Sequence, residues 1–67
     1  MKSDIIVVVL QVGIGTPVTP ELRELAEAEA NKRSARPVQD FKFMERKQSS
    51  FHPNVEELFF AGKGVKP

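Results

Sequence analysis

The sequence predicts a small α+β fold, a β-α-β-α module with a two-stranded sheet core and an extended C-terminal third. Residues 5–12 begin with six consecutive apolar residues and are rich in β-branched side chains, residues 20–33 favour a helix, and residues 38–46 alternate apolar and polar side chains. These patterns are typical of a buried strand, a helix and a half-buried strand, respectively. A chain of 67 residues without cysteine makes one domain at most. Its β-α-β core is expected in residues 1–46, and residues 47–67 are expected to form a loop, a short helix and a flexible basic tail.

Residues 5–12 read I-I-V-V-V-L-Q-V and form the stretch around which the rest of the chain is expected to fold. β-Branched side chains are stiff and pack well on a pleated surface, which favours a strand over a helix. The run does not alternate apolar with polar residues, so it predicts a strand that is covered on both faces. One cover is the chain's own helix, and the other is more of this chain, a second copy or a foreign protein.

The uncharged stretch of residues 5–20 is too short for a membrane helix. It has 16 positions and is interrupted by Gly13, Gly15 and Pro17, whereas a spanning helix needs about 20 apolar residues. Asp4 also spoils the basic start of a signal peptide. We therefore expect no membrane role.

The two glycines also resemble the start of a dinucleotide-binding loop, because they follow a strand and precede a helix. That loop needs a third small residue where this chain has Val18. It also belongs to a larger α/β sheet, for which 67 residues leave no room. We interpret the glycines as an ordinary strand-to-helix turn and predict no cofactor.

The helix begins at a strong N-terminal signal. Thr19 is a good N-cap, and Pro20 is favourable at the first helical position because its missing amide would have had no partner. Pro37 disfavours helical geometry in the residue before it, so the helix should end around residues 34–36. The apolar face is narrow, which leaves the second half of the helix in solvent or on a partner. Its apolar residues are Leu22, Leu25 and Ala26.

Residues 38–46 predict the second strand. Phe41 and Phe43 would point to one face, and Asp40 and Lys42 to the other. This strand is the expected sheet partner of residues 5–12. Parallel pairing through a right-handed crossover and antiparallel pairing both remain open.

A second, shorter helix is expected from Asn54 onward. Asn54 or Ser50 can cap it; Asn54 and Glu57 have the spacing of a capping box, and Gly62 suits the position after a helix end. Residues 63–67 would then be a flexible basic tail or an arm that becomes ordered on a partner.

The residue types that carry chemistry are sparse. His52 is the only histidine, and it precedes a proline at the expected entry to the second helix. Glu24 and Glu27 are neighbours on a helix but lie away from its leucines. We therefore predict no catalytic residue, no metal ligand and no small-molecule substrate, and we expect the chain not to be an enzyme.

The aromatic C-terminal third favours a non-enzymatic interaction or assembly protein. A two-turn helix cannot bury all of these side chains on one face, and aromatic residues often dominate binding at interfaces. The expected role is an accessory subunit or small modulator that docks on a protein partner or on itself. The expected location is the cytoplasm, or a larger intracellular or viral assembly. The predicted protein-interface residues are Phe51, Val55, Leu58, Phe59 and Phe60.

The alternative is a nucleic-acid-associated accessory protein. Residues 32–47 carry six basic and two acidic side chains, although the net charge of the whole chain is only +1. Basic side chains bind phosphates, and exposed aromatic residues on a strand can stack on bases. The candidate contacts are Lys32, Arg33, Arg36, Lys42, Arg46 and Lys47.

Overall fold

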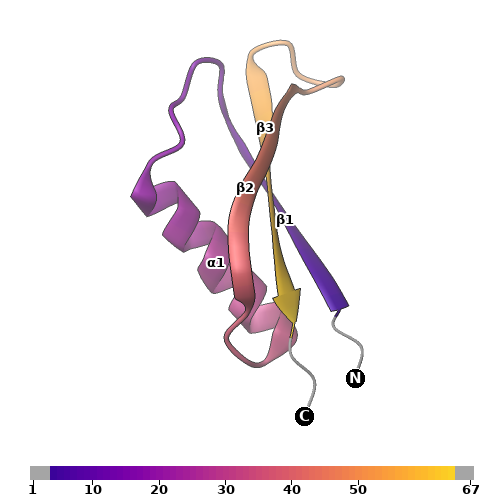
Figure 1. Cartoon of the computed structure of the whole chain (residues 1–67). Helices are drawn as coiled ribbons and strands as arrows, with labels where there is room; N and C mark the ends of the chain where they lie inside the picture. The colour runs from indigo at the N-terminus through magenta and orange to yellow at the C-terminus, as the bar shows by residue number, and fades with distance from the viewer. Residues whose placement is uncertain (1–3, 65–67) are drawn as a thin grey trace.

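The computed structural model describes residues 4–64, which form a three-stranded antiparallel sheet with one helix against one of its faces (Figure 1). The elements follow in the order β1 (Asp4–Gly13), α1 (Pro20–Ser34), β2 (Gln39–Gln48) and β3 (Val55–Gly64). Strand β3 lies in the centre, and the sheet order is β1-β3-β2. Because β1 and β2 are both antiparallel to β3, they run parallel to each other at opposite edges of the sheet.

The α+β class is confirmed, but the β-α-β-α order and the two-stranded core are wrong. The last element is the strand β3 rather than a short helix, and it separates the two strands that were expected to pair. Leu58 and Phe60 alternate along β3 and are fully buried, while the β3 backbone pairs with both neighbouring strands. This burial and two-sided pairing outweigh the local helix signal at Asn54 and Glu57. The part of the expected tail in residues 65–67 lies outside the described residues.

Strand β1 is an edge strand, and within residues 4–64 the helix covers one of its two faces. Cover of the second face by a second copy or a foreign protein stays a prediction. Strand β1 pairs with β3 without a register shift, from Asp4 opposite Gly64 to Gly13 opposite Val55. Its even-numbered side chains face the helix: Val8 belongs to the core, and Ile6, Leu10 and Val12 pack against it. The odd-numbered residues Ile5, Val7 and Val9 lie on the other face and are 63%, 47% and 40% exposed.

Helix α1 has the predicted ends but buries a different set of residues. The Thr19 hydroxyl accepts a hydrogen bond from the Leu22 amide at 3.2 Å, which is the expected cap. Ala26 and Ala30 are fully buried, whereas Leu25 is 63% exposed. Small side chains on the contact face let the helix lie close to the sheet. Within residues 4–64, no helix combines the length and the apolar character needed to cross a membrane.

The core lies between α1 and the sheet. The Phe41 and Phe60 rings are stacked with centroids 5.7 Å apart, and Phe43 meets Phe60 edge-on at 5.5 Å. The Phe41 ring also crosses the backbone of Gly62, where an added Cβ would lie only 2.9 Å from a ring carbon. The buried apolar residues are Val8, Ala26, Ala30, Val38, Phe41, Leu58 and Phe60.

Strand β2 is irregular where β1 is regular. Its register against β3 shifts between Gln39 and Lys42 and again between Phe43 and Glu45. At the second shift Met44 is an extra residue, as in a β-bulge, so the faces of the strand exchange there. Residues 41 and 43 therefore face the helix before the bulge, and residue 46 faces it afterwards. Asp40, in the first irregular segment, has the left-handed backbone angle φ +53°.

Candidate interaction surface

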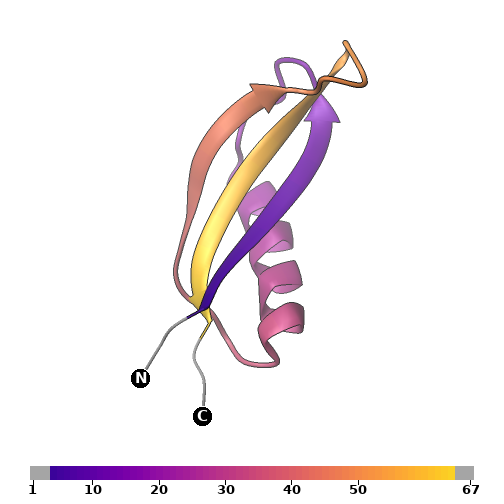
Figure 2. The ribbon, with the colours of Figure 1, turned by 90° about the vertical axis from the view of Figure 1, so that its right-hand side faces the viewer.

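The sheet face opposite α1 is covered by none of the described elements, and we call it the open face. Figure 2 shows the three strands in front of the helix. Strand β1 contributes Ile5, Val7 and Val9 to this face, and β3 contributes Phe59 and Ala61, which lie opposite Val9 and Val7. The β1 half of the open face is therefore an aliphatic surface with one aromatic ring beside it.

Charged side chains are concentrated on the β2 side of the open face. Lys47 pairs with Glu45 at 3.4 Å, and its Nζ lies 5.8 Å from the centre of the Phe59 ring. Lys63 of β3 pairs with Asp40 at 3.5 Å. By contrast, the sequence from Ile5 to Gly13 contains no ionisable residue. The open face thus changes from apolar at the β1 edge to charged at the β2 edge.

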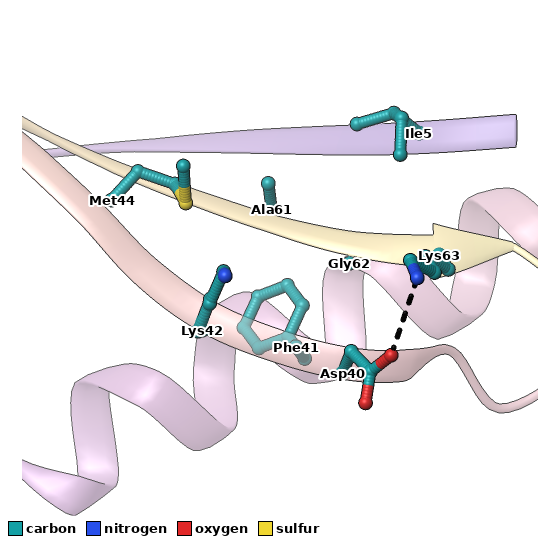
Figure 3. Close-up of a pocket in the computed structure, with 8 residues that line it drawn as sticks. All are labelled: Ile5, Asp40, Phe41, Lys42, Met44, Ala61, Gly62 and Lys63. Atoms are coloured by element: carbon teal, nitrogen blue, oxygen red, sulfur yellow. Dashed lines mark ion pairs between the residues drawn. The ribbon is translucent and has the colours of Figure 1, made fainter.

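A shallow hollow of about 490 Å³ lies at one end of this face (Figure 3). Ala61 and Gly62 have little or no side chain, and they lie between the larger side chains of Ile5 and Met44 on the outer strands. The hollow is lined by aliphatic residues and one ion pair. This lining fits the binding of a side chain from another protein better than it fits catalysis. Its lining residues are Ile5, Asp40, Phe41, Lys42, Met44, Ala61, Gly62 and Lys63.

The hydrogen-bond pattern identifies the backbone groups that face outward along β1. The Ile14 amide donates to the Asn54 carbonyl at 3.3 Å, in register with the β1–β3 ladder. Hydrogen-bonded and non-bonded pairs alternate in an antiparallel ladder. The even-numbered residues of β1 therefore bond to β3, and the N–H and C=O groups of Ile5, Val7, Val9 and Gln11 point away from the sheet.

Two arginines of α1 donate to backbone carbonyls on opposite edge strands. Arg33 donates from Nη1 to the Val7 carbonyl at 2.7 Å, which agrees with an outward-facing carbonyl on β1. Arg23 donates from Nη2 to the Phe41 carbonyl of β2, also at 2.7 Å. The helix therefore crosses the sheet diagonally, with its first half towards β2 and its last turn towards β1. Sequence analysis missed this role of both arginines, because it depends on which strands are the edges.

The five residues predicted as a protein interface do not form one surface. Leu58 and Phe60 are fully buried beneath α1, so they are core residues. Phe59 lies on the open face, and Val55 is partly buried at the start of β3. Phe51 is 86% exposed in the loop between β2 and β3.

The six predicted nucleic-acid contacts are also divided. Lys42 and Lys47 lie on the open face, opposite Ala61 and Glu57 of β3. The remaining residues lie on the helix, on the loop after it or on the helix-facing side of β2. In that group, Arg33 bonds to the Val7 carbonyl, and Arg46 pairs with Glu56 at 3.1 Å; the other members are Lys32 and Arg36.

The loop between β1 and α1 is held by a carboxylate. The Gly15 amide donates to Oε1 of Glu56 at 2.9 Å, and Arg46 bridges the same carboxylate to the Thr16 carbonyl. The Gly15 amide already donates to a negatively charged side chain, which disfavours phosphate binding at this amide. Within residues 4–64, no three histidine, aspartate or glutamate side chains are grouped as metal ligands.

Comparison with known proteins gives no relative: no protein-family model, curated protein or solved structure matches this chain.

Proposed function

We propose that this chain is a non-enzymatic interaction or assembly protein that binds another protein chain through β1. The binding surface consists of the outward edge of β1 and the apolar part of the open face beside it. The observation that carries the proposal is a regular ten-residue edge strand with no ionisable residue from Ile5 to Gly13.

The contrast between the two edges of the sheet supports this assignment. Proteins protect edge strands with charged residues and bulges, because unpaired backbone groups otherwise bind other strands. Strand β2 has these protections: two register shifts, and the charged residues Lys42, Glu45 and Lys47. Strand β1 has a continuous register, and within residues 4–64 only the Arg33 contact lies at its edge.

Strand addition is the binding mode that fits this surface. An added strand would hydrogen-bond to the outward groups of Val7 and Val9, and alternate side chains would supply specificity. On the open face these side chains would contact Ile5, Val7 and Val9, which are already exposed. Both the main-chain and the side-chain requirements are therefore met along one strand.

The first test compares V7K with M44K. Both replace a large apolar residue of the open face, and the two native side chains are similarly exposed, at 47% and 54%. Each variant is tagged, expressed in the native cells and cross-linked, and the captured proteins, including copies of the chain, are identified by mass spectrometry. We expect V7K to reduce capture at least ten-fold and M44K to have little effect.

The reverse result, loss of capture with M44K alone, would contradict the use of β1. Capture that disappears after nuclease treatment and falls steeply with salt would instead support nucleic-acid binding. Circular dichroism of both purified variants checks that each retains its fold.

A further inference from the structure

The partner that best fits the β1 edge is a second copy of this chain, and this inference rests on the proposed function. We propose that two β1 strands pair antiparallel about Val8, joining two three-stranded sheets into one six-stranded sheet. The interface would be two-fold symmetric, so each copy would present the same strand to the other.

The outward-facing backbone groups restrict the register. Antiparallel pairing requires outward residues to face outward residues, and these are the odd-numbered residues of β1. Pairing about Val8 places Val7 opposite Val9 of the partner subunit, and Ile5 opposite Gln11 of the partner subunit. It uses nearly the whole length of Asp4–Gly13. It also keeps the aliphatic residues of both copies on the same sheet face.

The lack of charge on β1 permits self-pairing. In a two-fold pairing of one strand with itself, residues near the axis lie opposite close neighbours of their own symmetry copies, as Val7 lies opposite Val9 of the partner subunit. Charges of one sign near the axis would therefore be brought together, which is destabilising when they are directly opposite. Between Ile5 and Gly13 there is no ionisable side chain, so self-pairing brings no like charges together along this stretch.

The helix layer carries a second apolar contribution on the same side of the molecule. Arg23 reaches the β2 edge of the sheet, and Leu25 is two residues further along, about 200° around the helix. Leu25 therefore lies on the flank that faces the β1 side, and it is 63% exposed. A second copy paired along β1 would place its own helix on this side of the molecule.

The Arg33 contact competes with this pairing for the Val7 carbonyl. Its guanidinium occupies the Val7 carbonyl, which in the dimer would accept from the Val9 amide of the partner subunit. The Arg33 side chain is 53% exposed and its ion pair with Glu29 is long, at 3.5 Å, so it can move away at low cost. Self-association is therefore expected to be reversible and dependent on concentration.

The decisive experiment compares two double variants, V7K/V9K and V7K/V9E, with the wild-type chain. In the Val8-centred register, V7K/V9K places like charges opposite each other in both symmetry-related pairs. V7K/V9E places opposite charges at the same positions, with the same loss of apolar surface. Sedimentation equilibrium across a concentration series, detected by interference because the chain has no Trp or Tyr, gives each dimer dissociation constant.

We expect a wild-type dimer, a dissociation constant raised roughly ten-fold or more in V7K/V9K, and recovery of most of that loss in V7K/V9E. A wild-type chain that stays monomeric at millimolar concentration would overturn the inference. Equal effects of the two double variants, or no effect of either, would also overturn it. If the chain is monomeric but V7K still abolishes capture of another protein, the self-pairing inference fails and the proposed function stands. If V7K changes neither result, both fail.

Discussion

Gly62 shows how one residue determines the packing of an aromatic pair. The Phe41 ring lies across the Gly62 backbone on the helix side of the sheet and stacks on Phe60. A Cβ at residue 62 would lie 2.9 Å from the ring and 3.3 Å from both the Phe41 Cα and a Val38 methyl. The Phe41 Cα is a backbone atom and cannot rotate away, and the Phe41 ring is a buried side chain of the core.

We expect G62A to lower the free energy of unfolding by about 1–3 kcal/mol, because the added methyl overpacks a filled site. Urea denaturation followed by circular dichroism measures this change. The matched control is G13A, whose added Cβ would meet only the Thr16 hydroxyl at 3.7 Å. An equal decrease in the free energy of unfolding in both variants would show that the cost comes from replacing any strand glycine and not from contact with Phe41.

At the scale of the element, β1 is defined by the difference between its two sets of backbone groups. Even-numbered residues bond to β3, whereas odd-numbered residues face the outside of the sheet. The same alternation separates core side chains from open-face side chains. Even-numbered residues of β1 therefore build the core, and odd-numbered residues form the surface that is available to a partner.

Amide hydrogen exchange should reveal this alternation directly. In dilute solution, where the chain is monomeric, we expect the amides of Ile6, Val8 and Leu10 to exchange at least ten-fold more slowly than those of Val7 and Val9. Two-dimensional NMR after transfer to deuterated buffer measures each rate. Protection that rises at Val7 and Val9 with increasing protein concentration would accompany dimer formation. Uniform rates along β1 would contradict the outward orientation of the odd-numbered groups.

Sequence alone predicted the first strand, the helix and the second strand, because each has a strong local signal. Thr19, Pro20 and Pro37 mark the helix ends in the sequence, and the structure places the helix between them. The third strand was missed because Asn54-Val55-Glu56-Glu57-Leu58 has the capping and spacing of a helix start. Its strand form depends on pairing with two distant segments, and that information is not local.

The candidate site depended on the same missing strand. The continuous apolar run of β1 was interpreted as a strand covered on both faces. With β3 absent from the predicted sheet, Leu58 and Phe60 were placed on a short helix and predicted to be protein-interface residues. Once β3 occupies the centre, Leu58 and Phe60 become core and the odd-numbered residues of β1 become surface. The lack of charge in β1 was visible in the sequence, but it pointed to burial until the strand order was known.

At the scale of the molecule, residues 4–64 form a two-layer structure with one helix for a three-stranded sheet. The helix covers one sheet face and contacts both edge strands through arginines. The open face and the β1 edge are the surfaces on which a chain of this size can gain further apolar burial. Association is therefore coupled to stability, because any partner that binds only the folded chain also stabilises it.

The two arginines give a matched pair of variants at this scale. We expect R33M to strengthen self-association several-fold, because it removes the group that competes for the Val7 carbonyl and keeps much of the aliphatic stem. R23M removes the equivalent contact at the β2 edge and should leave self-association unchanged. Sedimentation equilibrium measures the dimer dissociation constant of each variant. Stronger association in R23M than in R33M would place the contact between copies at β2 instead.

The arginine contacts also make α1 a spacer of fixed length across the sheet. Arg23 and Arg33 are ten residues apart, about 15 Å along a helix, and each meets a carbonyl of a different outer strand. The separation and the relative direction of the two side chains must both match the width and twist of three strands. One residue inserted between them would turn one arginine by about 100° relative to the other. Only one of the two arginines could then reach its carbonyl on an edge strand.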